Sequence, residues 1–406
     1  MIIQRRSFLT GLGAGLATLL VRPNLRAFAG APDGSRSGTK TVVVVMQRGA
    51  VDGLAMIPPH GDPELARVRP MLTGKMAGMT EPTIDLDGHL GLHPGLADLL
   101  PHWKANRLAI VPAVGLTGAP RSHFAAQDLL EQGGITGDSG WANRVLAHRP
   151  HAGDATAIAV GSTLPRALAG SAPALVLEQN GEVGIARKAP PAQREVLRSA
   201  FAELYATGAD PFSVTARRAL ASAARIEAAL AAQPASITVA KGPVGQALMT
   251  AARVIRANLG AELIVVDTGG WDTHVGQAQR LERGLGGLGA AIAGFATELG
   301  DKLGEVTLVT ISEFGRTVHE NGTGGTDHGT ATMSLVLGGN VDGGKVIGTF
   351  PGLAKDQLFE GRDLAITTDT RDLLGDVLAG TLGLSSADLA AVFPDHPLKR
   401  IGTTRA

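Results

Sequence analysis

Two loops late in the chain combine a carboxylate and a histidine among glycines. They are Gly269-Gly270-Trp271-Asp272-Thr273-His274 and Gly324-Gly325-Thr326-Asp327-His328-Gly329. Carboxylate and imidazole groups are the usual protein ligands of zinc, manganese and iron. Glycines beside them let the backbone pass close to an ion. The two loops therefore predict a site for a divalent metal, with these ligands: Asp272, His274, Asp327 and His328.

Acids and arginines also follow two other apolar runs that are typical of buried strands. Asp52 follows residues 41–46, and Ser312-Glu313-Phe314-Gly315-Arg316 follows residues 306–311. The carboxyl ends of parallel strands share one sheet edge, where α/β proteins bind ligands. Carboxylates crowded there would repel one another unless a cation were bound. We therefore expect Asp52 to be a metal ligand and Glu313 to ligate or orient, while Arg48 and Arg316 could hold an anionic group.

A third motif, Pro120-Arg121-Ser122-His123-Phe124, lies between a predicted strand and a predicted helix. A hydroxyl at a helix N-terminus lies where anions are stabilised. Ser122 could therefore be a metal-activated nucleophile for ester hydrolysis. The alternative is that Ser122 is an ordinary N-cap residue, which is a common role for serine.

Each of the other candidates also has a purely structural interpretation. Asp52 before Gly53 could shape a turn, and Asp272 could cap the following helix. The two histidines of the late loops could lie at the solvent edge, and Glu313 and Arg316 could form a structural ion pair. Joint placement at strand ends favours a functional site over these separate explanations.

The elements that position these loops read as an α/β fold. Continuous apolar runs predict buried strands at residues 41–46, 108–111, 157–160, 263–266, 306–311 and 333–337. Helices are predicted at residues 96–105, 124–132 and 245–258. A further long helix carries one apolar stripe: Leu281, Leu285, Leu288, Ile292, Phe295, Leu299 and Leu303. Alternating strands and helices predict three layers, a mostly parallel sheet with helices on both faces.

The middle of the chain, from about residue 190 to 235, has a different composition. It is rich in Ala, Arg and Glu, it has apolar residues at helical spacing, and it contains no candidate ligand. We interpret it as a helical insertion or lid, with plain helical scaffold as the alternative.

The N-terminus is typical of a twin-arginine export signal over residues 1–29. Gln4-Arg5-Arg6-Ser7-Phe8-Leu9-Thr10 is followed by a Gly/Ala/Leu run and by Ala27-Phe28-Ala29, an A-x-A cleavage site. The apolar run is too short and too glycine-rich to cross a bilayer of about 30 Å. We expect a periplasmic or otherwise exported protein that uses the twin-arginine translocase, with no membrane span after signal removal and one domain over residues 30–406.

Composition excludes several classes of function. The 37 basic residues balance 37 acidic ones, so nothing points to a nucleic-acid partner or an anionic membrane. The chain has no cysteine, which excludes disulfides, iron–sulfur clusters and covalent haem attachment.

The motifs together resemble the bacterial family called domain of unknown function 1501. Besides the signal and the late loops, the resemblance rests on Met46-Gln47-Arg48-Gly49-Ala50-Val51-Asp52-Gly53-Leu54, Arg121-Ser122-His123-Phe124 and Ser312-Glu313-Phe314-Gly315-Arg316-Thr317. It covers essentially the whole chain after the signal. The family layout is similar to the alkaline phosphatase and sulfatase superfamily, which implies a three-layer α/β fold and one or two metals.

The resemblance also implies roles for several residues. Asp52 matches the superfamily aspartate after the first strand, and Ser122 is the nearest match to its nucleophile. Glu313-Phe314 stands where the superfamily has an Asp-His pair, and Asp327-His328 follows one loop later. A single-metal site, or one with another ligand set, therefore fits better than a standard two-zinc site.

These observations predict an exported, metal-dependent hydrolase of a phosphate or sulfate ester, acting on a small anionic substrate. The alternative is a non-catalytic exported binding or assembly partner that keeps the fold with a degenerate site and pairs with a co-exported protein. A redox enzyme is a third alternative, but the chain has no dinucleotide-type glycine fingerprint after its first strand.

Overall fold

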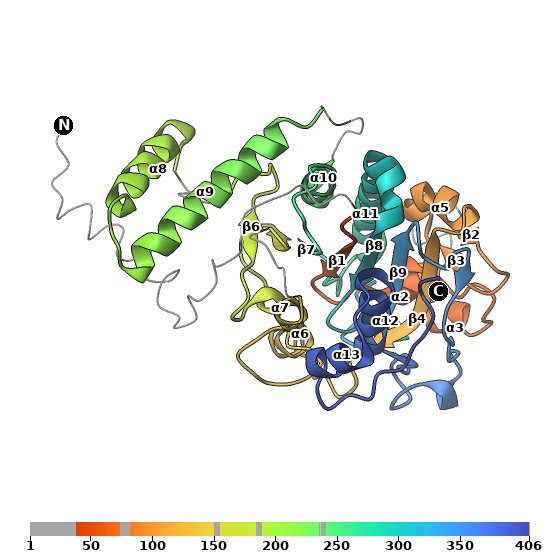
Figure 1. The fold of residues 1–406 in the computed structure, drawn as a ribbon. Helices are drawn as coiled ribbons and strands as arrows, with labels where there is room; N and C mark the ends of the chain where they lie inside the picture. Colours follow the sequence, from red (N-terminus) through yellow and green to blue (C-terminus); the bar gives the residue numbers. More distant parts are fainter. Residues whose placement is uncertain are drawn as a thin grey trace.

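A mixed sheet forms the centre of the molecule in the computed structural model, which describes residues 38–73, 82–149, 155–183, 189–234, 236 and 241–405. The predicted signal, residues 1–29, lies outside these residues. Within them the sheet has nine strands in the order β10-β4-β9-β8-β1-β7-β5-β6, and β11 pairs with β4 (Figure 1). The strands are β1 (Thr41–Gln47), β4 (Leu108–Gly115), β5 (Ala157–Val160), β6 (Leu175–Leu177), β7 (Leu263–Thr268), β8 (Val306–Ile311), β9 (Thr332–Gly338), β10 (Lys345–Val346) and β11 (Thr368–Asp369).

Strand direction confirms the prediction of a mostly parallel sheet, with β9 as the exception. β1 is parallel to both β7 and β8, and β5 is parallel to β7. β9 runs antiparallel to both of its neighbours, β8 and β4. The N-terminal end of β9 therefore lies at the same sheet edge as the carboxyl ends of β1, β7 and β8. Because of this reversal, the connection from β8 to β9, residues 312–331, begins and ends at the edge where the loops after β1 and β7 also lie.

Both faces of the sheet are covered by helices, which gives the predicted three layers. Val43 and Val45 of β1 point into one core with α10 (Gly242–Arg256) and α11 (Gln277–Leu299). Val42 and Val44 point into a second core on the other face. That core contains α7 (Trp141–Ala147), α12 (Thr370–Leu382) and α13 (Ser386–Val392). In Figure 1 these two helix groups lie on opposite sides of the strands.

The predicted apolar stripe of the long helix is buried. All seven residues of the stripe, from Leu281 to Leu303, are below 5% exposed, and α11 packs closely along α10. Helices α7, α12 and α13 and strands β6, β10 and β11 have no counterpart among the predicted elements.

Short helical elements connect the strands and the longer helices. They are α2 (Gly53–Met56), α3 (Leu65–Val68), α4 (Pro70–Thr73), η2 (Pro94–Leu99), α5 (Leu100–Lys104), α6 (His123–Glu131), η3 (Arg166–Leu168), η4 (Gly300–Glu305) and η5 (Lys355–Gln357). A separate two-stranded sheet pairs β2 (Ile84–Asp85) with β3 (Gly91–Leu92). α6 begins at the edge where the candidate loops meet.

The range of the predicted insertion contains two helices, α8 (Pro191–Tyr205) and α9 (Pro211–Ala231). In Figure 1 they extend beyond β6, at one end of the molecule. α9 reaches the core with Ala223, Ile226 and Leu230. Across the described ranges, no helix combines the length and apolar character needed to cross a membrane.

Candidate metal centre

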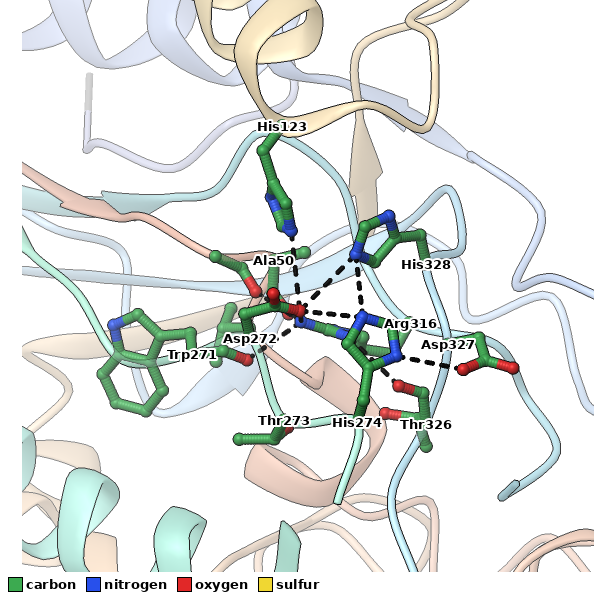
Figure 2. Close-up of polar contacts among 12 residues, drawn as sticks. Ala50, His123, Trp271, Asp272, Thr273, His274, Arg316, Thr326, Asp327 and His328 are labelled. Carbon is green, nitrogen blue, oxygen red and sulfur yellow. Dashed lines mark hydrogen bonds and ion pairs between the residues drawn. The ribbon is translucent and has the colours of Figure 1, made fainter. Parts of the chain in front are cut away.

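Four segments meet at the carboxyl edge of the sheet. The loop after β7 carries Asp272 and His274, and the loop before β9 carries Asp327 and His328. The first part of the same β8–β9 connection brings Arg316 to the same place, and His123 comes from the first turn of α6 (Figure 2). The convergence expected from the sequence is therefore present, with the antiparallel β9 supplying one of the loops.

Three donor groups lie close enough to share one ion. One ligand atom each of His123, Asp272 and His328 lies within 4.8 Å of the other two. Asp272 Oδ1 is 3.5 Å from His123 Nε2 and 3.4 Å from His328 Nε2. The Nε2 atom of His274 is 3.0 Å from the same oxygen. Figure 2 shows the three rings arranged around the Asp272 carboxylate.

Each of the three imidazoles is held through Nδ1 by an oxygen that only accepts hydrogen bonds. These oxygens are Glu313 Oε1 for His123 (2.8 Å), the Arg121 carbonyl for His328 (3.0 Å) and Asp327 Oδ1 for His274 (3.0 Å). Each Nδ1 atom must therefore carry the proton. In the neutral rings, the Nε2 atoms that face Asp272 then carry lone pairs.

The donor set fits a divalent cation. His274 Nε2 and His328 Nε2 lie 3.0 Å apart, so their lone pairs repel unless a proton or a cation lies between them. His123 Nε2 is buried and has no hydrogen-bond partner among the described residues. Metal-bound histidines usually donate their other N–H to a carboxylate or carbonyl, as all three rings do here. Burial also lowers the pKa of His328, which keeps that ring neutral.

Asp272 is held in its ionised form by Arg316. Burial alone would raise the pKa of Asp272, but the hydrogen bond and the positive charge of Arg316 outweigh burial and lower that pKa to about 2. The bond joins Arg316 Nη2 to Asp272 Oδ1 at 2.6 Å. The carboxylate is 47% exposed, so the centre opens to solvent on this side.

Arg316 is buried, and its guanidinium group donates hydrogen bonds to other parts of the protein. Its side chain donates to the carbonyl oxygens of four residues: Gly49, Ala50, Trp271 and Thr326. Arg316 therefore joins the loops after β1 and β7 to both ends of the β8–β9 connection, residues 312–331. The predicted role of Arg316 in holding an anionic group is not supported by this geometry.

Glu313 is fully buried and orients a ligand. Its Oε1 atom accepts hydrogen bonds from Gly49 N–H and Gln127 Nε2, both at 2.8 Å, as well as from His123. Burial alone would raise the pKa of Glu313, but these hydrogen bonds lower it, so the side chain is ionised. Of its two predicted roles, ligation and orientation, the contacts support orientation.

Arg48 does not contact the candidate ligands directly. Its Nη1 donates to Gln127 Oε1 at 3.0 Å and to Glu131 Oε1 at 2.7 Å, and its Nη2 is 3.0 Å from Asp267. Gln127 in turn donates to Glu313. Arg48 is thus connected to the centre through other side chains, and both acids take up its charge.

The structure does not bring Asp52 together with the other predicted ligands. Asp52 is buried and accepts two hydrogen bonds from Arg69 Nη1, at 2.7 and 2.9 Å. It also caps α2 by accepting from Ala55 N–H. The contacts match the structural interpretation of this residue as one that shapes the chain after the first strand.

Ser122 and Asp327 also differ from their predicted roles. Ser122 is exposed at the N-cap of α6, but its side chain makes no capping hydrogen bond, and no hydrogen bond joins it to the donor groups. Asp327 is 55% exposed and lies on the far side of His274 from Asp272 (Figure 2). Asp327 thus acts on the centre through the His274 ring.

His123 is the donor that was not among the predicted ligands. It stands in the motif from which we selected Ser122, one residue further along. The signal that identifies it is its position as the first residue of α6. From there the ring reaches both Glu313 and Asp272.

Gly49 explains why the loops can approach so closely. Its φ angle is +112°, and a Cβ atom there would lie 2.7 Å from the backbone nitrogen of Asp272. Both the conformation and the contact require glycine. Asp272 is therefore packed directly against the loop that follows β1.

A comparison with known families matches residues 39–393 to the family described as protein of unknown function (DUF1501). The chain belongs to this family. The matched range includes every side chain of the candidate centre described above, from His123 to His328, together with Asp52 and Arg48. A search of curated proteins found no match.

Proposed function

We propose that this DUF1501 protein is an exported metal-dependent hydrolase of a phosphate or sulfate ester. The observation that carries the proposal is the convergence of His123 Nε2, His328 Nε2 and an ionised Asp272 oxygen within 4.8 Å of one another. These three groups would hold one divalent metal: zinc, manganese or iron. Glu313 and the Arg121 carbonyl would fix the two imidazoles.

The remaining pair, His274 and Asp327, is suited to move a proton. Asp327 accepts from Nδ1–H of His274 and so leaves Nε2 able to accept a proton. A carboxylate that orients an imidazole in this way is the base arrangement of many hydrolases. The His274 side chain is 39% exposed, so a water molecule can reach Nε2. Water is therefore our proposed nucleophile, and Ser122 is not required.

A bound divalent metal would polarise the ester oxygen and lower the pKa of a coordinated water. The protein's own part is to keep Asp272 ionised through Arg316 and to place a hydrogen-bond acceptor at Nδ1 of each imidazole, so that the three Nε2 atoms face Asp272. It also leaves the Asp272 side of the centre open to a substrate.

The ester class and the export route rest on the sequence. The resemblance to the alkaline phosphatase and sulfatase superfamily supports a phosphate or sulfate ester. The three-layer arrangement of one sheet between two helical layers is compatible with that superfamily. The motif Gln4-Arg5-Arg6-Ser7-Phe8-Leu9-Thr10 supports export through the twin-arginine translocase.

One observation favours the alternative, a non-catalytic exported partner of another protein. Arg48 and Arg316, the side chains predicted to hold an anionic group, are both committed to contacts within the protein. If neither arginine is released from these contacts, an anionic substrate would be held by the metal and not by Arg48 or Arg316. Such a centre could also serve as a structural metal site at an interface.

The test is metal content followed by turnover, on protein purified after export in its native host. We expect about one equivalent of metal in the wild type, and less than about a tenth in His123→Ala and His328→Ala, because each loses one of three ligands. His60→Ala is the matched control, since His60 pairs with Asp85 at 3.0 Å on the surface, outside the centre. Hydrolysis of aryl phosphates or aryl sulfates should follow metal content.

Two outcomes would change the proposal. Metal without turnover of any ester would favour the binding partner. A folded wild type without metal would mean that the imidazoles share protons and that the centre is structural.

A further inference from the structure

A buried hydrogen-bond network lies beneath the centre and is organised by Gln277. This residue is the first of α11 and is fully buried. Its Oε1 atom accepts from Thr273 Oγ1 at 2.9 Å and from Thr326 Oγ1 at 2.6 Å. Its Nε2 atom donates to Asp52 Oδ2. Thr273 lies between Asp272 and His274, and Thr326 directly precedes Asp327, so one amide joins the two loops that carry donors.

The orientation of the Gln277 amide is fixed from outside the centre. Asp52 is paired with the buried Arg69, and both are about 1% exposed. Arg69 is itself held by the carbonyl oxygens of Thr317 and Val318, each at 2.8 Å. An ionised carboxylate can only accept, so the amide nitrogen must face Asp52. The amide oxygen must then face both threonines, and the network has a single arrangement.

Other hydrogen bonds also join the same two loops, including those from Asn321 Nδ2 and Thr323 Oγ1 to the His274 carbonyl, but none of them involves the Gln277 side chain. Thr326 N–H donates to the Thr273 carbonyl at 3.2 Å, and Gln277 N–H donates to the Gly324 carbonyl at 2.8 Å. Asp272, His274 and His328 make no hydrogen bond to Gln277 within the described residues. Gln277 can therefore influence the donors only by setting where their loops lie.

We propose that Gln277 is a positioning residue for the metal centre. It sets the separation between the Asp272–His274 loop and the Asp327–His328 loop, and Asp52 with Arg69 fixes its orientation. The proposal rests on the metal centre proposed above. It gives Asp52 a role in that centre through Gln277, in place of direct ligation.

The test compares two nearly isosteric replacements of buried amides. Gln277→Met removes all three side-chain hydrogen bonds of Gln277. Asn143→Leu is the matched control, because Asn143 is a buried amide of α7, in the core on the opposite face of the sheet, with three hydrogen bonds to Leu168 and Ala172. Cobalt(II) is the probe, and its visible absorption reports ligand geometry.

We expect Gln277→Met to bind cobalt about 10- to 100-fold more weakly, the usual effect of removing support behind a ligand, and to change the cobalt spectrum. Asn143→Leu should lose a similar amount of stability to urea and keep both cobalt properties. Within the network, Thr273→Ser keeps the hydroxyl and should bind like the wild type, whereas Thr273→Val should bind more weakly.

Equal loss of cobalt affinity in Gln277→Met and Asn143→Leu would overturn the proposal, as would wild-type binding by Thr273→Val. If Gln277→Met does not fold, the Thr273 pair decides alone. If the wild type binds no cobalt, the metal centre fails, and hydrogen exchange then tests positioning separately. Gln277→Met should speed exchange in residues 271–276 and 323–329 while Asn143→Leu does not, and unchanged exchange would refute the role of Gln277.

Discussion

Asp272 connects a buried guanidinium to the three imidazoles of the centre. Its carboxylate accepts from Arg316 at 2.6 Å and lies within 3.5 Å of each Nε2 atom. Because its pKa is lowered to about 2, this carboxylate is ionised at neutral and mildly acidic pH. Mild acidification therefore leaves the Asp272 carboxylate in the form that would bind a cation.

The lowered pKa predicts how stability depends on acid. A carboxylate with a folded-state pKa below its ordinary value of 3.8 stabilises the protein above that value, and the contribution is lost as pH falls towards 2. The shift corresponds to about 2.4 kcal/mol at full strength, and to about 1 kcal/mol after screening, since the side chain is nearly half exposed. Urea unfolding of metal-free protein between pH 5 and 2 should show this loss in the wild type but not in Asp272→Asn.

A substitution at Gly49 can test how closely the loop after β1 must approach Asp272. We expect Gly49→Ala to cost about 1–3 kcal/mol through its positive φ and to reduce metal content as well, because the new Cβ would push on the nitrogen of Asp272. Gly118→Ala is the control, since Gly118 also has a positive φ but nothing lies within 4 Å of its Cβ position. A similar metal content in both variants would show that the contact with Asp272 does not matter.

Residue types predicted the site better than they predicted individual roles. The glycine-flanked acids and histidines of the late loops do meet, because the pairing of β1, β7, β8 and β9 brings both loops to one sheet edge. Sequence could not show that Ser122 points away while His123 points in, since that depends on where the first turn of α6 starts. It also could not show that Arg69, 17 residues later, withdraws Asp52 from the centre.

At the scale of elements, the direction of β9 decides whether the site exists. In an all-parallel sheet the loop before this strand would lie at the opposite edge, about 20 Å away for a seven-residue strand. Apolar composition is the same for a buried strand of either direction, so the run at residues 333–337 predicted the strand but not its reversal. The placement of His328 follows from pairing with β8 and β4.

The stripe of α11 gives a prediction about stability alone. Leu285 of α11 is fully buried in the core that also contains α10. Leu285→Ala should therefore lower the free energy of unfolding by about 2–5 kcal/mol while the metal content of the folded protein stays unchanged. Leu164→Ala, at a 43% exposed leucine, should cost less than about 1 kcal/mol, and urea titrations compare the two. Loss of metal from folded Leu285→Ala would show that the core and the centre are coupled.

Helix α12 was not predicted because its buried face includes acids. Asp372 and Asp376 are buried among its leucines and accept hydrogen bonds from the tail, from Lys399 N–H and Thr403 N–H. Charged residues at core positions weaken the apolar periodicity on which the prediction of a helix depends. Strands β10 and β11, of two residues each, are too short to leave a pattern.

At the scale of the whole molecule, the centre joins parts of the chain that are far apart in sequence. Glu313 accepts from Gly49, 264 residues away, and Arg316 donates to the Gly49 carbonyl across 267 residues. The pairing of β1 with β8 spans a similar separation, and contacts between such distant residues are typical of slow folding. The donors themselves come from residues 123, 272 and 328.

The large sequence separation of the donor residues limits when the centre can form during synthesis. A growing chain on the ribosome has no metal centre until residue 328 has emerged and β9 has paired with β8 and β4. The proposed centre can bind an ion only after these strands have paired, and from then on its Asp272 side is open to solvent. If residues 1–29 send a folded protein across the membrane, the centre is complete in the compartment of synthesis and meets the metal ions of that compartment first.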